Sequence, residues 1–93
     1  MVIGAATFEL EITDGVTLKD KRQVVRSLLD RLRHQLRVAA AEVDDLNSRQ
    51  FATIAVVTVS NKDAVVHRTL AYANTLVTSE PRVQVMDFRT EIL

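Results

Sequence analysis

The sequence contains no cysteine, no tryptophan, two glycines and one proline. Without cysteine there can be no disulfide, thiolate nucleophile, iron–sulfur centre or cysteine-ligated zinc, and this composition suits a reducing compartment, so the cytoplasm is the expected location. Two glycines are too few for a glycine-rich phosphate-binding loop, which disfavours nucleotide enzymes. Twelve basic and twelve acidic residues leave no net charge, so any argument from charge must be a local one.

The chain also has no hydrophobic run long enough to cross a bilayer. Its first apolar stretch, "MVIGAATFELEI", has no basic region before it and meets Glu9 early, so we expect neither a signal peptide nor a membrane span. A length of 93 residues and the absence of a low-complexity linker predict a single domain over residues 1–93.

Apolar residues recur with the period of strands in some segments and of helices in others. Strands are expected over residues 2–12, 38–43, 51–60 and 82–92, and helices over residues 18–37 and 61–78, with a turn at 13–15. Thr17 with Asp20 and Ser60 with Asp63 are expected to cap the two helices. The buried stripe of the first helix is expected to comprise Val25, Leu28, Leu29, Leu32 and Leu36.

The order strand, helix, strand, strand, helix, strand describes two split crossover units. It predicts an α+β fold of the ferredoxin-like βαββαβ type, with an antiparallel four-stranded sheet in the order 4-1-3-2 and both helices on one face. The first and third strands are the most apolar, as the two central strands of such a sheet should be.

A row of cations runs along one flank of the first predicted helix. At about 100° per residue these side chains share one side of the helix, away from the second helix and above the strand at 38–43. The members are Lys19, Arg22, Arg26, Arg33 and Arg37. Two interpretations remain open: the cations are an ordinary solvated flank, or they track the phosphate backbone of an RNA.

The residue types that carry catalysis or bind metals do not converge. Glu42, Asp44 and Asp45 are interpreted as a solvated turn, because Mg²⁺ needs oxygens from more than one loop. His34 and His67 lack a second ligand at helical spacing, and the serines lack a nearby base. The sequence therefore predicts no catalytic, cofactor-binding or metal-binding residue, and a protein that is not an enzyme.

The sheet face away from the helices is predicted to be apolar, with one aromatic residue and two carboxylates, which makes a poor platform for stacking RNA bases. Its candidate interface residues are Ile3, Ala5, Val57, Val59, Val83 and Val85. Such a patch suggests a homodimer. The edge of the strand at 38–43, which has neither Lys nor Pro, is a rival route to the same end.

Several of these segments resemble the YlxP-like family, a small bacterial group of unknown function. The resemblance lies in "MVIG…FELEI", "TLKDKRQVVRSLLDRLR", "VAAAEVDDL" and "IAVVTVSN", and its most specific element is "TLKDKR" at 17–22. It implies a ferredoxin-like fold and, from the family's frequent gene neighbourhood among translation-initiation and ribosome-maturation factors, a ribosomal role. The loop at 44–50 departs from the family, which commonly has Asp and Trp where this chain has Asn47 and Arg49.

Together these observations predict a non-enzymatic cytoplasmic homodimer, with no membrane association, that binds RNA, ribosomal RNA or a ribosomal particle through the row of cations. The alternative is a protein–protein interaction module, a homodimer through the open sheet face, with no direct RNA contact. The particular RNA and the role of the loop at 44–50 are left open.

Overall fold

Strands and helices follow one another in the predicted order in the computed structural model, which describes residues 1–13 and 17–93. The turn expected at 13–15 therefore lies largely outside the described residues. The elements are β1 (Val2–Ile12), α1 (Leu18–Leu36), β2 (Ala39–Asp44), β3 (Phe51–Ser60), α2 (Asp63–Thr78) and β4 (Val83–Ile92).

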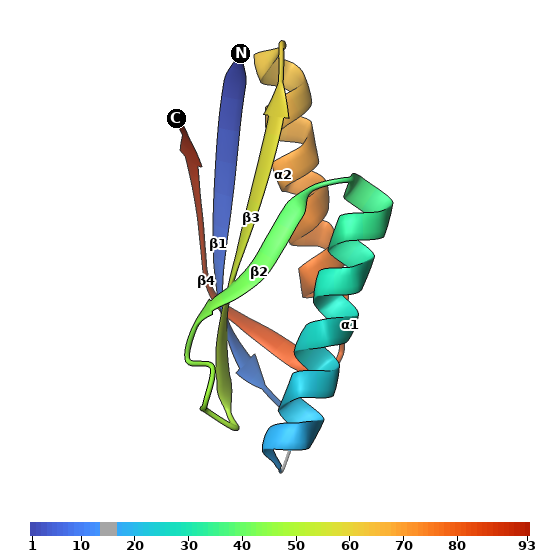
Figure 1. Ribbon diagram of the computed structural model, residues 1–93, viewed down its shortest axis with the longest axis vertical. Helices are drawn as coiled ribbons and strands as arrows, with labels where there is room; N and C mark the ends of the chain where they lie inside the picture. The colour runs from blue at the N-terminus through green and yellow to red at the C-terminus, as the bar shows by residue number, and fades with distance from the viewer. Residues whose placement is uncertain (14–16) are drawn as a thin grey trace.

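The strands form one antiparallel sheet in the order β2-β3-β1-β4, which is the predicted order read from the other edge. Figure 1 shows both helices on one side of this sheet. The architecture is ferredoxin-like, as the sequence predicts. Among the described residues, neither helix has the length and uniform hydropathy that crossing a bilayer requires.

The core lies between the sheet and the helix layer. β1 and β3 contribute every second residue to it, so Phe8, Leu10, Ile54 and Val56 are almost fully buried. The rings of Phe8 and Phe88 pack with their centroids 4.9 Å apart. The helices cover this layer with apolar side chains at helical spacing: Val24, Val25, Leu28 and Leu32 from α1, and Val66, Leu70, Ala73 and Val77 from α2.

The packing between β1 and α2 depends on Gly4. A Cβ at this position would collide with Val66 Cγ1 and lie 3.1 Å from Leu70 Cδ1. Because the χ1 angle of a helical valine is stiff, Val66 cannot easily turn away. Glycine therefore lets α2 approach the sheet more closely than any other residue would.

α1 begins as predicted, with a complete capping box. The Thr17 hydroxyl accepts a hydrogen bond from the Asp20 amide at 3.1 Å, and the Asp20 carboxylate accepts one from the Thr17 amide at 3.2 Å. The buried stripe differs from the prediction, because Leu29 and Leu36 are only partly buried whereas Val24 is buried. The stripe is rotated towards α2, and Leu28, which is 0% exposed, is its centre.

The cap predicted for α2 is wrong. The helix begins at Asp63, its N-cap is Lys62, and no side chain caps it. Ser60 is the last residue of β3, and its hydroxyl accepts a hydrogen bond from the Lys62 amide at 3.2 Å. The hydroxyl thus closes a local turn two residues before the helix, which is the competing role that serine often takes.

The prediction that Val83 and Val85 lie on the open sheet face is also wrong. The β1–β4 register shifts between Glu9 and Leu10, where Glu9 pairs with Asp87 and Leu10 with Val85. Met86 is the extra residue of this bulge, and an extra residue reverses which side chains face the core. Val83 and Val85 therefore pack against the core, and Asp87, Arg89 and Glu91 take the open face beside β1.

Candidate functional site

The predicted row of cations, which we call the basic flank, comprises Lys19, Arg22, Arg26, Arg33 and Arg37. Arg22, Arg26 and Arg33 line a groove of about 260 Å³ together with Val25, Leu29 and Glu42. Because Glu42 belongs to β2, the groove lies between α1 and β2. The basic flank is therefore on the side of α1 that the sequence predicts; its role stays a prediction.

The members of the basic flank differ in how they are held. The side chains of Lys19, Arg22 and Arg26 are exposed and make no hydrogen bond or ion pair with any residue that the structure describes. The guanidinium of Arg33 donates to the Ala40 carbonyl at 2.6 and 3.2 Å and lies 3.7 Å from Asp30. Arg37 follows the helix as its C-cap, in the left-handed conformation with φ 54°.

The bond between Arg33 and Ala40 has a consequence for β2, which is an edge strand. Strand edges offer unpaired carbonyl and amide groups to other strands. Since the Ala40 carbonyl already accepts two hydrogen bonds from Arg33, another strand would have to displace that side chain. Arg33 therefore hinders the pairing of another strand with this edge, and its guanidinium is less available to a ligand than those of Arg22 and Arg26.

Lys21 belongs to the same segment of sequence but points inward. Its side chain is 0% exposed, and Nζ lies 2.6 Å from Glu42 Oε2 and donates to the Asp45 carbonyl at 2.8 Å. Sequence reasoning missed this role. The signal was available, because Lys21 is four residues before Val25 and so falls on the buried row of the helix.

Lys21 fixes the start of the loop between β2 and β3. Its ammonium binds the Asp45 carbonyl, which also accepts from the Ser48 amide at 3.0 Å. Asp45 itself has φ 61° and its carboxylate accepts from the Thr53 hydroxyl at 3.3 Å. Glu42 and Asp45 are therefore bound by protein groups. Within the described part of the chain, His, Asp and Glu do not gather in threes as a metal site would require.

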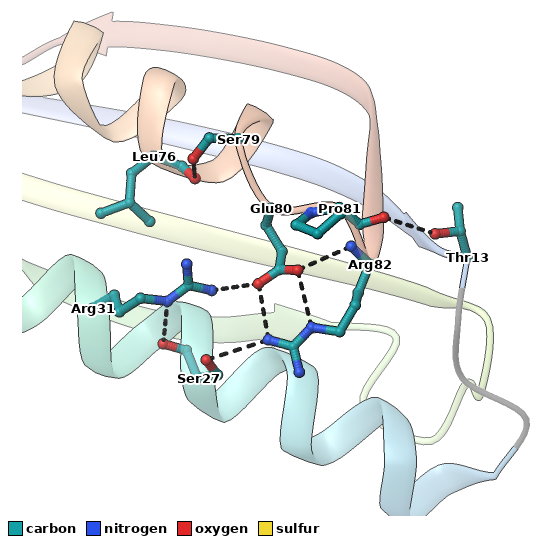
Figure 2. A network of polar contacts seen from close by, with 8 residues as sticks. All are labelled: Thr13, Ser27, Arg31, Leu76, Ser79, Glu80, Pro81 and Arg82. Atoms are coloured by element: carbon teal, nitrogen blue, oxygen red, sulfur yellow. Dashed lines mark hydrogen bonds and ion pairs between the residues drawn. The ribbon is translucent and has the colours of Figure 1, made fainter.

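A second ionic cluster lies where α2 connects to β4. Glu80 is 4% exposed, and Figure 2 shows its carboxylate between Arg31 of α1 and Arg82. Oε1 accepts from Arg31 at 2.6 Å and from the Arg82 guanidinium at 2.8 Å, while Oε2 accepts from Arg82 Nε and from its backbone amide, both at 2.9 Å. These bonds tie the end of α2 to α1.

The hydrogen bonds to Glu80 favour its charged form. The bond to the Arg82 side chain contributes most, and with those from the Arg82 backbone and Arg31 it outweighs the burial, which acts in the opposite direction; the pKa of Glu80 falls from 4.5 to about 2. A pKa this low means that the carboxylate holds its charge firmly, the opposite of what a general acid or base requires. The cluster is therefore structural.

The serine hydroxyls are engaged in hydrogen bonds with other groups of the protein. The hydroxyls of Ser48 and Ser60 accept backbone amides, Ser79 donates to the Leu76 carbonyl, and Ser27 accepts from Arg82. His34 and His67 are exposed, and Nδ1 of His34 lies 2.7 Å from the Asp30 carbonyl. Among the described residues, no serine hydroxyl shares a hydrogen bond with a histidine.

A family model described as "Protein of unknown function (DUF503)" matches residues 3–90 of the chain. No curated protein matches the sequence significantly.

Solved structures match over almost their whole length, at low sequence identity. The designed protein Foldit4 has a TM-score of 0.58 at 7% identity, with 98% of this chain and 97% of that chain covered. SnoaB of Streptomyces nogalater, a cofactor-independent oxygenase, has a TM-score of 0.55 at 7% identity and coverages of 98% and 90%. The structural-genomics protein YJCS has a TM-score of 0.55 at 11% identity, with 96% of each chain covered. At such identities these likenesses show the fold alone.

Proposed function

The chain belongs to DUF503, a family of proteins of unknown function, and we propose that this member is a non-enzymatic protein that binds RNA through the basic flank of α1. The RNA would be ribosomal, either free or within a ribosomal particle. Its phosphates, rather than its bases, would be the groups recognised.

The observation that carries the proposal is the way the cations divide. Those away from the basic flank and within reach of an acid are engaged: Lys21 with Glu42, Arg31 and Arg82 with Glu80, and Arg89 with Asp87. Lys19, Arg22 and Arg26 are exposed on one side of one helix and make no such pair on the described chain. Arg37, the C-cap of α1, has no ion pair on the described chain either. Away from the basic flank, the cations without such a pair there are Arg49, between β2 and β3, and Lys62 and Arg68, at the start of α2 and within it.

The spacing of these side chains suits an extended polyanion. Lys19, Arg22 and Arg26 span about 10 Å of helix, and Arg37 extends the row to about 27 Å at about 1.5 Å per residue. Neutralising phosphates along such a row releases counterions, and this effect supplies affinity without reading the sequence. Because no aromatic side chain accompanies the row, strong preference for one RNA sequence is not expected.

The resemblance to the YlxP-like family supports a ribosomal target and, with it, a place in the cytoplasm. The "TLKDKR" element divides into two parts in the structure. Thr17, Asp20 and Lys21 serve the fold, as the capping box and the buried ion pair. Lys19 and Arg22 have no such structural task and face outward.

The test is a double charge reversal, Arg22→Glu with Arg26→Glu, matched by Lys62→Glu with Arg68→Glu. Both pairs are exposed cations on or beside a helix, so the two variants change the net charge equally. Binding to purified ribosomal RNA and to ribosomal particles is measured by filter binding and co-sedimentation across salt concentrations. Three or four contacts predict a log–log slope of about −2 to −3 for wild type.

We expect the reversal on α1 to remove most of the affinity and to flatten the salt dependence, while the control binds nearly as wild type does. Circular dichroism and melting temperature should stay close to wild type in both, because the four side chains face water. Wild-type protein that binds neither RNA nor particles at low salt would refute the proposal, and so would equal losses in the two variants.

The alternative function, a protein–protein interaction module without RNA contact, is favoured by one separate observation. The open sheet face exposes Val57 and Val59 by 41% and 60%. Two results together would support this alternative. Wild-type protein would bind no RNA, and the variant with Arg22→Glu and Arg26→Glu would still bind the protein partners that wild type binds.

A further inference from the structure

The side of the sheet away from the helices carries an uncovered apolar surface on three adjacent strands. The β1–β3 register sets Ile3 beside Val59 and Ala5 beside Val57, and the β2–β3 register sets Ala39 beside Val57 and Ala41 beside Ala55. We call this surface the apolar half-face; its residues are Ile3, Ala5, Ala39, Ala41, Ala55, Val57 and Val59. None of them is fully buried, and Val59 is 60% exposed.

The apolar half-face has both a hollow and a ridge. A shallow groove of about 240 Å³ is lined by Ala39, Ala40, Ala41, Val43, Ala55 and Val57. Alanine is a poor strand former because its small side chain makes few packing contacts with neighbouring strands. The same small side chain lets another surface come close. Val57 forms one wall of this hollow, and Val59 and Ile3 lie beyond it as larger side chains.

We propose that the apolar half-face is covered by a second copy of this chain, in an isologous contact that packs sheet against sheet. An isologous interface must be complementary to itself, and a patch that carries a hollow next to a ridge meets this condition, since each copy can place its ridge over the hollow of the other.

The size of the face sets the affinity that such a contact can have. The strands have 11, 6, 10 and 10 residues, so at about 3.4 Å per residue and about 4.8 Å per strand the whole open face is on the order of 600 Å². A standard interface buries about 800 Å² on each partner. The apolar half-face is the smaller part of this area, so we expect an interface below the standard size and a weak dimer that forms at high micromolar concentration.

The charges on the face argue against other occupants. Beyond the apolar half-face it carries Glu9, Glu11, Asp87 and Glu91, and its one cation on the described strands, Arg89, already lies 3.0 Å from Asp87 and 3.8 Å from Glu9. An acidic excess repels RNA and anionic lipid alike. An uncharged apolar surface is a better partner for the apolar half-face, and the apolar half-face of a second copy is such a surface.

Pairing through the β2 edge would give a different dimer and is the weaker route. Arg33 occupies the Ala40 carbonyl, and Lys21 draws the Glu42 side chain inward. Contact through the open face disturbs neither. A contact through the open face also leaves the helix layer exposed, so the basic flank stays accessible. Dimerisation and RNA binding can therefore be tested independently of each other.

The test is sedimentation equilibrium of the wild-type protein from low micromolar to several hundred micromolar concentration, compared with Val57→Asp and Ala41→Arg. Each variant places a charge on the half-face, and we expect each to raise the dimer dissociation constant by roughly a hundredfold or more. Tyr72→Asp is the matched control, since Tyr72 is 56% exposed on α2 and far from the half-face; it should dimerise as wild type does.

Circular dichroism and urea melts of the variants show whether they fold. Because Ala41 is exposed on an edge strand, Ala41→Arg should fold even if Val57→Asp does not. Two results would overturn the proposal: a wild type that is monomeric at several hundred micromolar, or a dimer that persists in folded Val57→Asp and folded Ala41→Arg alike.

Discussion

The replacement of Glu80 by glutamine should be the most informative single change to the stability of this protein. The pKa of Glu80 is lowered from 4.5 to about 2, chiefly by its hydrogen bonds to Arg82. Each pKa unit corresponds to about 1.4 kcal/mol, so the ionised form stabilises the fold by up to about 3 kcal/mol. Arg31 and Arg82 are about one-third exposed and can turn to water in the variant, so we expect Glu80→Gln to cost about 2 kcal/mol at neutral pH.

The pH dependence has a definite sign. A carboxyl whose pKa is lower in the folded state contributes its full stability above its unfolded pKa, here 4.5, and loses it as the pH falls to about 2. Wild type should therefore lose stability steeply between these values. Glu80→Gln has no proton to take up at this position, so its profile in that window should be flatter and should approach that of wild type at the acidic end.

Urea unfolding followed by circular dichroism at a series of pH values measures both effects. Glu91→Gln is the matched control, because Glu91 is exposed near the end of β4 and should cost only a few tenths of a kcal/mol. Equal losses in the two variants at neutral pH, or a Glu80→Gln profile that runs parallel to wild type in acid, would show that the Glu80 cluster does not stabilise the fold as its geometry indicates.

Three further changes test the packing, each by denaturant unfolding. Lys21→Met should cost about 3–5 kcal/mol, because it leaves Glu42 without its partner, and Lys21→Met with Glu42→Gln should recover part of the loss; a loss below 1 kcal/mol would contradict the inward position. Leu28→Ala should cost about 2–5 kcal/mol and Leu29→Ala clearly less; the reverse order would mean that the phase of α1 is wrong. Gly4→Ala should cost about 1–3 kcal/mol through overpacking, and a stabilised variant would disprove the close approach of α2.

The order of elements could be predicted from the sequence because its strongest signals are local. The capping box at Thr17 and Asp20 fixes where α1 begins, alternation fixes β1, and a run that is apolar on both faces fixes β3. The helix cap predicted at Ser60 was wrong for a local reason as well. A serine shortly before an acidic residue can either cap a helix or close a turn, and which of the two it does depends on where the preceding strand ends.

The faces of β4 could not be predicted, because one bulge reverses them. Nothing in "RVQVMDFRTEI" marks Met86 as the extra residue; the shift is set by pairing with Leu10 on another strand. Sequence periodicity gives the parity of a strand only while its register is unbroken. This is why Val83 and Val85 were predicted on the open face although they pack against the core.

For the candidate site, helical angles predicted the position of the cations but not their partners. The partners of Arg33 and Lys21 lie on β2 and in the loop after it, and the partner of Arg31 is Glu80, far along the chain. These contacts depend on tertiary distances that no spacing within one helix contains. What distinguishes Arg22 and Arg26 from other arginines is therefore visible only in the folded protein.

The Glu80 cluster also bears on the order in which the protein folds. It joins Arg31 to Glu80 across 49 positions of sequence and Ser27 to Arg82 across 55, so it can close only after both βαβ halves have met. Such contacts are expected to be largely absent from the transition state and to slow unfolding rather than to speed folding. The ion pairs of Arg31 and Arg82 with Glu80 would then stabilise the native state without stabilising the transition state. Mild acid, or Glu80→Gln, should therefore raise the unfolding rate while the folding rate stays nearly unchanged.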